Sequence, residues 1–159
     1  MKKLLLVIDC QNAFINEYTK KYVDKIKLLL DKKEYSNIVF TIFKNSETSP
    51  FYNLLGYKGC ITDNDCKLMI DYKATVIEKE NYSAVNQELL EYIITNNIEE
   101  IYLCGFDTDG CILKTALDLF ENNKKIFILK DYCMSTGGEN YHNEAIDILK
   151  RSIGEMNII

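Results

Sequence analysis

Short apolar runs alternate with amphipathic stretches along this chain, and no other feature constrains the fold as strongly. Five of the runs are rich in branched residues, which suits strands that are buried on both faces of a sheet. They cover residues 4–8, 38–43, 74–77, 101–104 and 126–129. A final run at 156–159 predicts an additional edge strand.

Helices are predicted between these runs, because apolar side chains recur there at helical spacing. The four stripes begin at Tyr18, Val85, Ile112 and Tyr141. Repetition of strand, helix and strand predicts an α/β fold, a mostly parallel, doubly wound sheet of five or six strands in a three-layer α/β/α sandwich. With 159 residues, the whole chain (1–159) is expected to form a single domain.

Charge and hydropathy narrow the range of functions. The net charge of −5 argues against a nonspecific nucleic-acid binder, which needs a basic face, and against binding to an anionic membrane surface. No segment approaches the ~20 consecutive apolar residues of a membrane-spanning helix. The first apolar run stops before Asp9 with no cleavage site after it, so we expect a first strand here and not a signal peptide. We therefore expect a cytoplasmic protein whose partner is a small molecule.

The six cysteines are expected to be free thiols, because the chain has no secretory signal. There is no Cys-x-x-Cys pair, and the spacing of Cys60 and Cys66 fits no standard zinc pattern. The single histidine, His142, lies far from any cysteine cluster in the sequence and is interpreted as a packing or capping residue.

Three chemically distinct residues follow the predicted strands. Asp9 follows the first strand, Lys79 the third and Cys111 the fourth. Ligands of open parallel sheets bind beyond the carboxyl ends of the strands, so these residues are expected to meet at one edge. A thiol at a helix N-terminus, as predicted for Cys111, is expected to be stabilised as the reactive thiolate. Taken singly, Asp9 could cap a turn, Lys79 could be a solvated charge and Cys111 a small buried hydrophobe.

Three segments resemble the signature blocks of the isochorismatase-like cysteine hydrolases, in the right order and spacing. They are residues 7–14, 78–84 and 105–116, and the third, with its Thr-Asp-x-Cys core, is the most specific. Residues 131–135 and His142 also resemble the last strand and helix of that family. The family has a Rossmann-like sheet and includes nicotinamidases, carbamoyl-amide hydrolases and isochorismatase.

The resemblance implies a role for each member of a Cys-Asp-Lys triad. Cys111 would attack a carbonyl carbon to give a thioester, Asp9 would take the thiol proton, and Lys79 would hold Asp9 ionised. The backbone N–H groups of Asp107 and Cys111 would bind the oxyanion. The resemblance also implies a cis peptide bond between Phe106 and Asp107.

Substrate and metal expectations follow from the same resemblance. Phe14, Tyr82 and Phe106 are candidates to line a small substrate pocket. Nicotinamidases carry an Asp-x-His metal motif between the second and third strands, and this chain has no histidine there, so no catalytic metal or other cofactor is expected. Isochorismatases proper do not need the cysteine, so Cys111 implies cleavage of an amide or carbamoyl-type C–N bond.

Other interpretations remain open at this point. A catalytically idle relative could bind a small molecule or a protein through the irregular region 51–72, which is also long enough to be a lid. A flavodoxin-like or nucleotide-binding domain is disfavoured, because Gly105 and Gly110 do not form a glycine-rich phosphate loop. Relatives commonly pair or form tetramers, so a homodimer or tetramer is expected.

Overall fold

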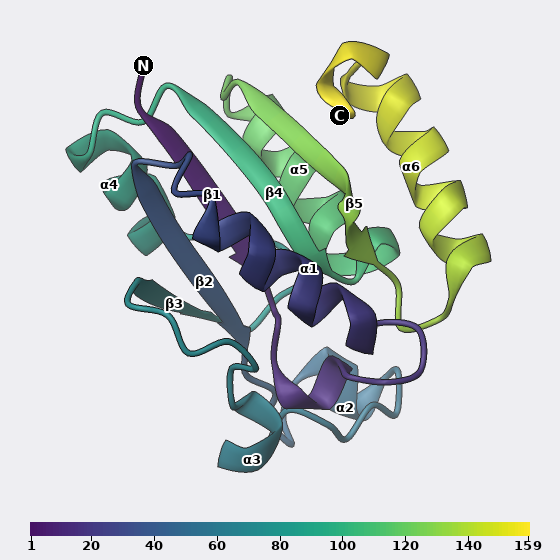
Figure 1. Cartoon of the computed structure of the whole chain (residues 1–159). Helices are drawn as coiled ribbons and strands as arrows, with labels where there is room; N and C mark the ends of the chain where they lie inside the picture. The colour runs from purple at the N-terminus through teal and green to yellow at the C-terminus, as the bar shows by residue number, and fades with distance from the viewer.

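The computed structural model describes residues 1–159 and contains one sheet of five parallel strands, as predicted (Figure 1). The strands are β1 (Lys3–Ile8), β2 (Asn37–Phe43), β3 (Thr75–Lys79), β4 (Glu100–Phe106) and β5 (Ile126–Met134). Their order is β3-β2-β1-β4-β5. Each strand contains or overlaps one of the apolar runs of the sequence, because a parallel sheet that is covered on both faces admits continuous apolar segments.

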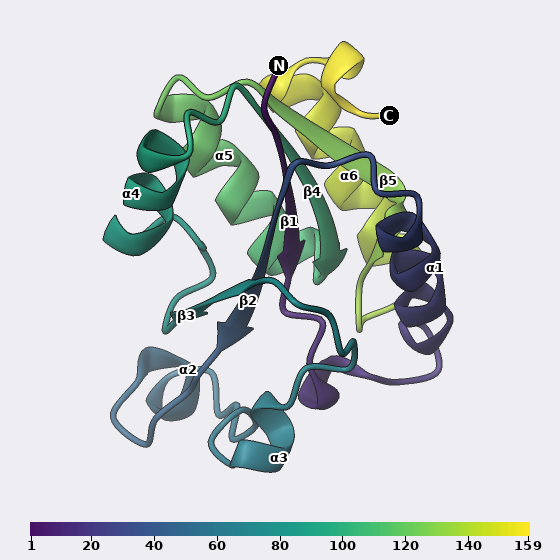
Figure 2. The same cartoon turned by 60° about the vertical axis from the view of Figure 1, so that its left-hand side comes forward.

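Helices cover both faces of the sheet (Figure 2). The long ones are α1 (Lys20–Asp31), α4 (Gln87–Thr95), α5 (Leu113–Glu121) and α6 (Glu139–Ile153). Helix α1 lies on one face, and α4 and α5 lie on the other. Helix α6 packs against α5 and β5. The three-layer α/β/α arrangement expected from the sequence is therefore present.

The core is centred on β1. Its residues Leu4 to Ile8 are fully enclosed, because β1 lies in the middle of the sheet with β2 on one side and β4 on the other. These side chains belong to one cluster of 35 buried apolar residues that includes both helix layers. Burial of this size is what fixes the strand order and, through it, the positions of the strand ends.

The strand order reverses between β1 and β4. From β1 the chain proceeds outward to β2 and β3, and it then returns to the other side of β1 to form β4. Doubly wound sheets bind ligands at this reversal, beyond the carboxyl ends of the strands. Ile8 pairs with Gly105 there, and Phe43 pairs with Lys79 at the end of the neighbouring strands.

The segment between β2 and β3 carries two short helices, α2 (Pro50–Asn53) and α3 (Asp63–Cys66). It is anchored to the loop after β1, because the Asn12 N–H donates to the Lys67 carbonyl and the Met69 N–H to the Cys10 carbonyl. The irregular region 51–72 of the sequence is thus an ordered wall below the sheet edge (Figure 2).

The predicted edge strand at 156–159 is wrong. The chain leaves α6 through Gly154, at a φ of 97°, and forms a 3-10 helix (Glu155–Asn157). Ile158 then forms one isolated bridge with Ile128 of β5, in which the Ile159 N–H donates to the Ile128 carbonyl and the Ile159 carbonyl accepts from the Lys130 N–H.

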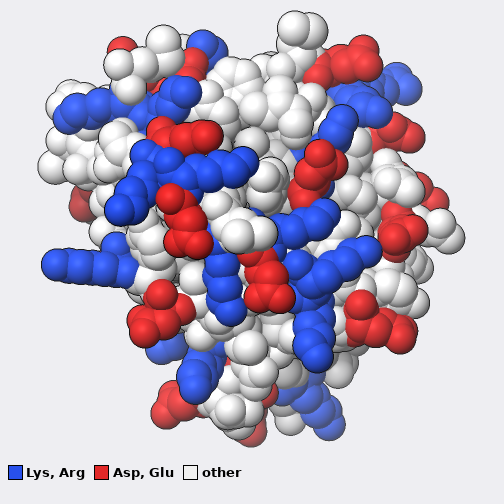
Figure 3. Space-filling model, in the orientation of Figure 1, with Lys and Arg blue, Asp and Glu red and all other residues white.

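Acidic and basic side chains are interspersed over the face of the molecule shown in Figure 3. None of the helices combines the length and the apolar character needed to span a bilayer.

Candidate active site

Asp9 stands directly after β1, buried and in the left-handed backbone region at a φ of 47°. Thr41, on the neighbouring strand β2, holds it at two points. The Thr41 hydroxyl donates to Asp9 Oδ1 at 2.6 Å and accepts from the Asp9 N–H at 3.1 Å. Sequence reasoning missed Thr41, because it lies inside an otherwise apolar strand.

Lys79 is the last residue of β3, and its ammonium group reaches over the end of β2. Nζ lies 2.7 Å from Asp9 Oδ2 and 3.3 Å from Cys111 Sγ. It also donates to the carbonyls of Asn81, at 2.8 Å, and Tyr82, at 3.1 Å. The side chain is 1% exposed, so the ion pair with Asp9 is shielded from water. The desolvation cost of a buried ion pair is offset only where its hydrogen bonds are satisfied, as they are here for the ammonium group.

Cys111 lies in a π-helical turn (Thr108–Ile112) that joins β4 to α5. Single turns of this kind are frequent at functional sites. The structure therefore brings together Asp9, Lys79 and Cys111, which come from three different strand ends.

Burial dominates the acid–base behaviour of Cys111. It raises the pKa of the thiol well above its usual value, and the nearby Asp9 carboxylate raises it further, while Lys79 lowers it. Burial therefore opposes the thiolate that the helix N-terminus is expected to stabilise. The resting form is the thiol, so a base must remove its proton when it reacts.

Burial has the opposite effect on Lys79, because burial alone lowers the pKa of an ammonium group. The Asp9 carboxylate and Cys111 outweigh that effect, and the pKa of Lys79 stands above its ordinary value. Lys79 is thus a permanent cation beside the sulfur.

The turn between β4 and α5 has an unusual backbone. The peptide bond between Phe106 and Asp107 is cis, as expected. Gly105 has a φ of 115°, and a Cβ atom there would lie 2.1 Å from the carbonyl oxygen of Ile8. This close approach of β4 to β1 requires glycine and sets the distance between Asp9 and the Cys111 turn.

A cavity of about 280 Å³ opens onto Cys111. Two of the three predicted pocket residues, Phe14 and Tyr82, line it. The prediction for Phe106 is wrong, because this side chain is fully buried in the core cluster. The other lining residues are Ala13, Asn16, Phe43, Phe51, Leu55, Tyr57, Asp107, Gly110 and Thr136.

Some of the missed lining residues had a signal in the sequence. Phe43 ends β2 and Thr136 follows β5, so the rule that places ligands at strand ends points to both. Phe51 and Tyr57 come from the segment between β2 and β3, whose sequence shows no pattern that would place them here.

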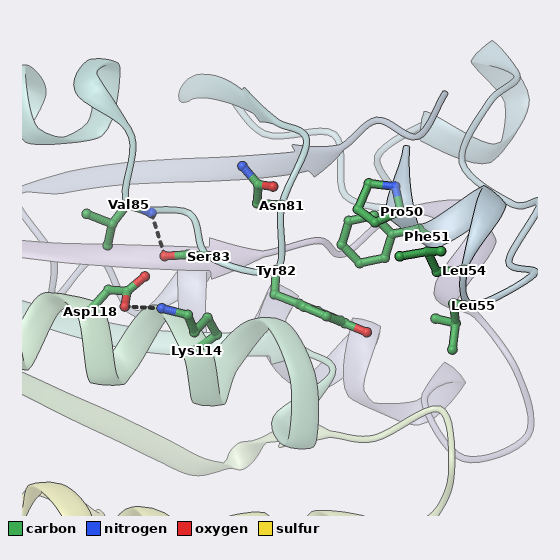
Figure 4. Close-up of a pocket in the computed structure, with 10 residues that line it drawn as sticks. All are labelled: Pro50, Phe51, Leu54, Leu55, Asn81, Tyr82, Ser83, Val85, Lys114 and Asp118. Carbon is green, nitrogen blue, oxygen red and sulfur yellow. Dashed lines mark hydrogen bonds and ion pairs between the residues drawn. The ribbon is translucent and has the colours of Figure 1, made fainter. Parts of the chain in front are cut away.

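A larger groove of about 660 Å³ lies beside this cavity and is shown in Figure 4. Phe51 and Tyr82 line both, and their rings meet edge to face with centroids 4.8 Å apart. The groove contains none of Asp9, Lys79 and Cys111. We therefore take the smaller cavity as the candidate active site and the groove as its approach.

Asp107 is one of the residues that line the cavity, and its carboxylate is bound to Thr136, which lines it as well. Its Oδ1 accepts from the Thr136 N–H at 2.6 Å and its Oδ2 from the Thr136 hydroxyl at 2.8 Å. Burial raises the pKa of Asp107 to about 6, although these two hydrogen bonds lower it. The group is therefore ionised at neutral pH at some cost.

His142 lies outside the cavity. Its Nδ1 is 2.7 Å from the Thr108 hydroxyl, and burial lowers the pKa of the imidazole. A neutral, hydrogen-bonded histidine that supports the Cys111 turn agrees with the packing role expected from the sequence.

The isochorismatase domain model matches residues 3–156, nearly the whole chain. The chain belongs to the isochorismatase-like hydrolase family. Isochorismatase family protein 2A of Dictyostelium discoideum is 34% identical over 68 residues, which are 42% of this chain and 34% of that protein. The chain thus spans about a third of the length of this curated relative.

Solved structures share the fold over nearly their full length. N-carbamoylsarcosine amidase from Thermoplasma acidophilum has a TM-score of 0.81 and 23% identity, and the match covers 97% of this chain and 94% of that one. The pyrazinamidase of Pyrococcus horikoshii, solved in complex with zinc, has a TM-score of 0.84 and 20% identity over 99% of this chain and 97% of that one. At these identities the likeness concerns the fold.

The residues of this chain do not fit a bound metal ion of the kind seen in the pyrazinamidase structure. No group of three His, Cys, Asp or Glu side chains lies close enough together to hold one. Five of the twelve residues that line the cavity are aromatic, and their rings are not metal ligands in the way that imidazole or carboxylate groups are.

Proposed function

We propose that this protein is a metal-independent cysteine amidohydrolase that cleaves a C–N bond in a small amide or carbamoyl substrate. One observation carries the proposal. The Lys79 ammonium group contacts both the Asp9 carboxylate, at 2.7 Å, and the Cys111 sulfur, at 3.3 Å, at the edge of a cavity large enough for a small molecule.

Asp9 is suited to be the base. Its Oδ1 accepts from the Thr41 hydroxyl, whereas Oδ2 is paired with the Lys79 ammonium group at 2.7 Å, and the carboxylate is also within hydrogen-bonding reach of Cys111. Oδ2 therefore retains a lone pair for the thiol proton. This matters because the resting Cys111 is protonated.

The reaction then proceeds in two balanced steps. As Asp9 takes the proton, Cys111 Sγ bonds to the substrate carbonyl carbon, and the oxyanion is held by the N–H groups of Asp107 and Cys111. Asp9 returns the proton to the departing nitrogen as the C–N bond breaks, which leaves a thioester. Asp9 next removes a proton from water as the water oxygen attacks the thioester, and the C–S bond then breaks as Asp9 returns that proton to sulfur, which releases the carboxylic acid and regenerates the thiol.

Lys79 contributes electrostatically. Negative charge moves from the Asp9 carboxylate to the Cys111 sulfur in the first step. The Lys79 ammonium group contacts both atoms, so it stabilises the negative charge before and after the proton transfer. The substrate class is supported by the relatives, since the names of the Thermoplasma and Pyrococcus proteins describe an amidase and a pyrazinamidase.

Ammonia release from a panel of primary amides and ureides tests the proposal. We expect at least one member to be turned over by the wild type and by Cys66→Ala, a buried thiol outside the cavity, but not by Cys111→Ala. Turnover that survives in Cys111→Ala would contradict the mechanism. Absence of turnover across the panel would favour a catalytically idle protein that binds a small molecule.

A further inference from the structure

Asp107 is the only charged side chain among the residues that line the Cys111 cavity. We propose that Asp107 is a specificity-determining residue, which makes the enzyme prefer amide substrates that carry a cationic nitrogen, such as an ammonium, amidinium or guanidinium group. This inference rests on the proposed function, because it concerns the substrate of the same site.

The Asp107 carboxylate is held in place and still has acceptor capacity. Thr136 supplies two donors, its N–H to Oδ1 and its hydroxyl to Oδ2. An ionised carboxylate offers about four lone-pair sites. Two of them are free to accept from an N–H group of a molecule in the cavity, with no need to break the contacts to Thr136.

The remainder of the wall suits a cation as well. Five aromatic residues line the cavity: Phe14, Phe43, Phe51, Tyr57 and Tyr82. The Phe51 ring meets Phe43 and Tyr82 edge to face, with centroids 4.9 and 4.8 Å apart. Aromatic faces attract ammonium and guanidinium groups, most strongly where water is excluded. The Lys79 ammonium group already lies 5.1 Å from the centre of the Phe43 ring.

The balance of charge favours the same conclusion. Lys79 and Asp9 neutralise each other, and their side chains are 1% and 0% exposed. No lysine or arginine lines the cavity. The Asp107 carboxylate is therefore the uncompensated charge that a substrate meets, so it attracts a cation and repels a carboxylate.

A purely structural Asp107 would have no need of its charge. An asparagine side-chain oxygen also accepts from the Thr136 N–H, although more weakly than a carboxylate, and a neutral amide avoids the cost of burying an anion. Asp9 and Asp109 both raise the pKa of Asp107, which adds to that cost. A role of the Asp107 charge in substrate recognition explains why this position carries an aspartate and not an asparagine.

Alkylthiolating reagents test this preference without a known substrate. The thiolate of Cys111 attacks the sulfenyl sulfur of a methanethiosulfonate, a disulfide forms and methanesulfinate leaves. The aminoethyl, hydroxyethyl and sulfonatoethyl reagents deliver a cation, a neutral group and an anion of similar size. Each rate at Cys111, followed by peptide mass spectrometry, is divided by the rate of the same reagent with free mercaptoethanol.

We expect the normalised ratio of the aminoethyl to the sulfonatoethyl rate to fall about tenfold in Asp107→Asn, the size expected for one charge a few ångströms away in a partly solvated cavity. Asp109→Asn is the matched control, because Asp109 is exposed and does not line this cavity. It should change the ratio far less than Asp107→Asn does, because Asp109 acts on the site only through its charge at a distance, and Asp107→Glu should retain most of the preference.

Two results overturn the inference, namely an unchanged ratio in Asp107→Asn or an equal loss in Asp109→Asn. If Asp107→Asn does not fold, the wild-type ratio at about pH 5 replaces it. Protonation of Asp107 should then reduce the preference, and a ratio equal to that at about pH 7.5 overturns the inference. The hydroxyethyl reagent separates the two proposals, because its failure to modify Cys111 contradicts the proposed function and not the charge preference alone.

Discussion

The Thr41 hydroxyl group anchors one carboxylate oxygen of Asp9, Oδ1, and leaves the other, Oδ2, for the proposed chemistry. It binds Oδ1 at 2.6 Å, so that Oδ2 is left facing Lys79 at 2.7 Å. Asp9 directly follows β1 and Thr41 lies within the adjacent strand β2, and their contact therefore depends on the register of the two strands. Thr41 is a positioning residue for the proposed base.

Replacement of Thr41 by valine should lower kcat and leave KM nearly unchanged. The Asp9 carboxylate loses a buried hydrogen bond and is free to rotate, so we expect a loss of about tenfold in kcat and about 1–2 kcal/mol in the free energy of unfolding. Thr41→Ser, which restores the hydroxyl group, should recover most of kcat. Steady-state kinetics on the best amide of the panel measures both, and a valine variant with full kcat would contradict this role.

Gly105→Ala should be strongly destabilising. The added Cβ atom would lie 2.1 Å from the Ile8 carbonyl oxygen, and neither backbone can move without separating β1 from β4. We expect a loss of more than about 3 kcal/mol by chemical denaturation. Gly56→Ala is the control, because its φ is also positive, at 75°, but nothing lies within 4 Å of the added atom. It should cost only about 1 kcal/mol, and equal losses in the two variants would contradict the steric argument.

Asp107→Asn should stabilise the protein more at neutral than at acidic pH. Burial raises the pKa of Asp107 to about 6. The folded state therefore binds this proton more tightly than the unfolded state, and the wild type gains stability as the pH falls through 6 towards 4. The asparagine variant lacks that gain. Its advantage should be about 1 kcal/mol at pH 7.5, a small value because the group keeps some contact with solvent, and should shrink at pH 4.5. Urea denaturation at both pH values checks this, and a constant difference would contradict it.

The rate at which iodoacetamide modifies Cys111 should rise with pH throughout the range from 6 to 9. Burial raises the pKa of this thiol above its ordinary value, so the reactive thiolate is scarce at low pH. Cys111 should nevertheless be labelled before the other five cysteines, none of which lines the cavity. Site-resolved mass spectrometry follows all six. Full labelling of Cys111 at mildly acidic pH would show that the thiolate is the resting form after all.

Much of this architecture was predictable from local sequence. The strands are largely continuous apolar runs, and polar residues at or shortly after their carboxyl ends lie at one sheet edge, which is why Asp9, Lys79 and Cys111 were recognisable. Thr41 was not, because within 38–43 it looks like another β-branched residue of a buried strand. The role of Thr41 depends on the register of β2 against β1, which places its hydroxyl group beside Asp9.

Other features depend on tertiary packing. Phe106 ends β4 next to the cavity, but its side chain faces the core, and the side of a strand that a residue faces is known only from the neighbouring layers. Phe51 and Tyr57 reach the cavity because region 51–72 folds back below the sheet. The pKa of Cys111 likewise reflects burial, which outweighs the helix N-terminus that the sequence makes visible.

The pH profile of Cys111 alkylation in two variants tests most directly whether Asp9, Lys79 and Cys111 form one electrostatic unit. Lys79 lowers and Asp9 raises the pKa of this thiol. The profile should therefore shift to higher pH in Lys79→Met and to lower pH in Asp9→Asn, although Asp9→Asn loses turnover. Lys44→Ala, which removes an exposed ammonium group paired with Glu78, should not shift it. Profiles that stay in place in both variants, or that move in the same direction, would contradict the account.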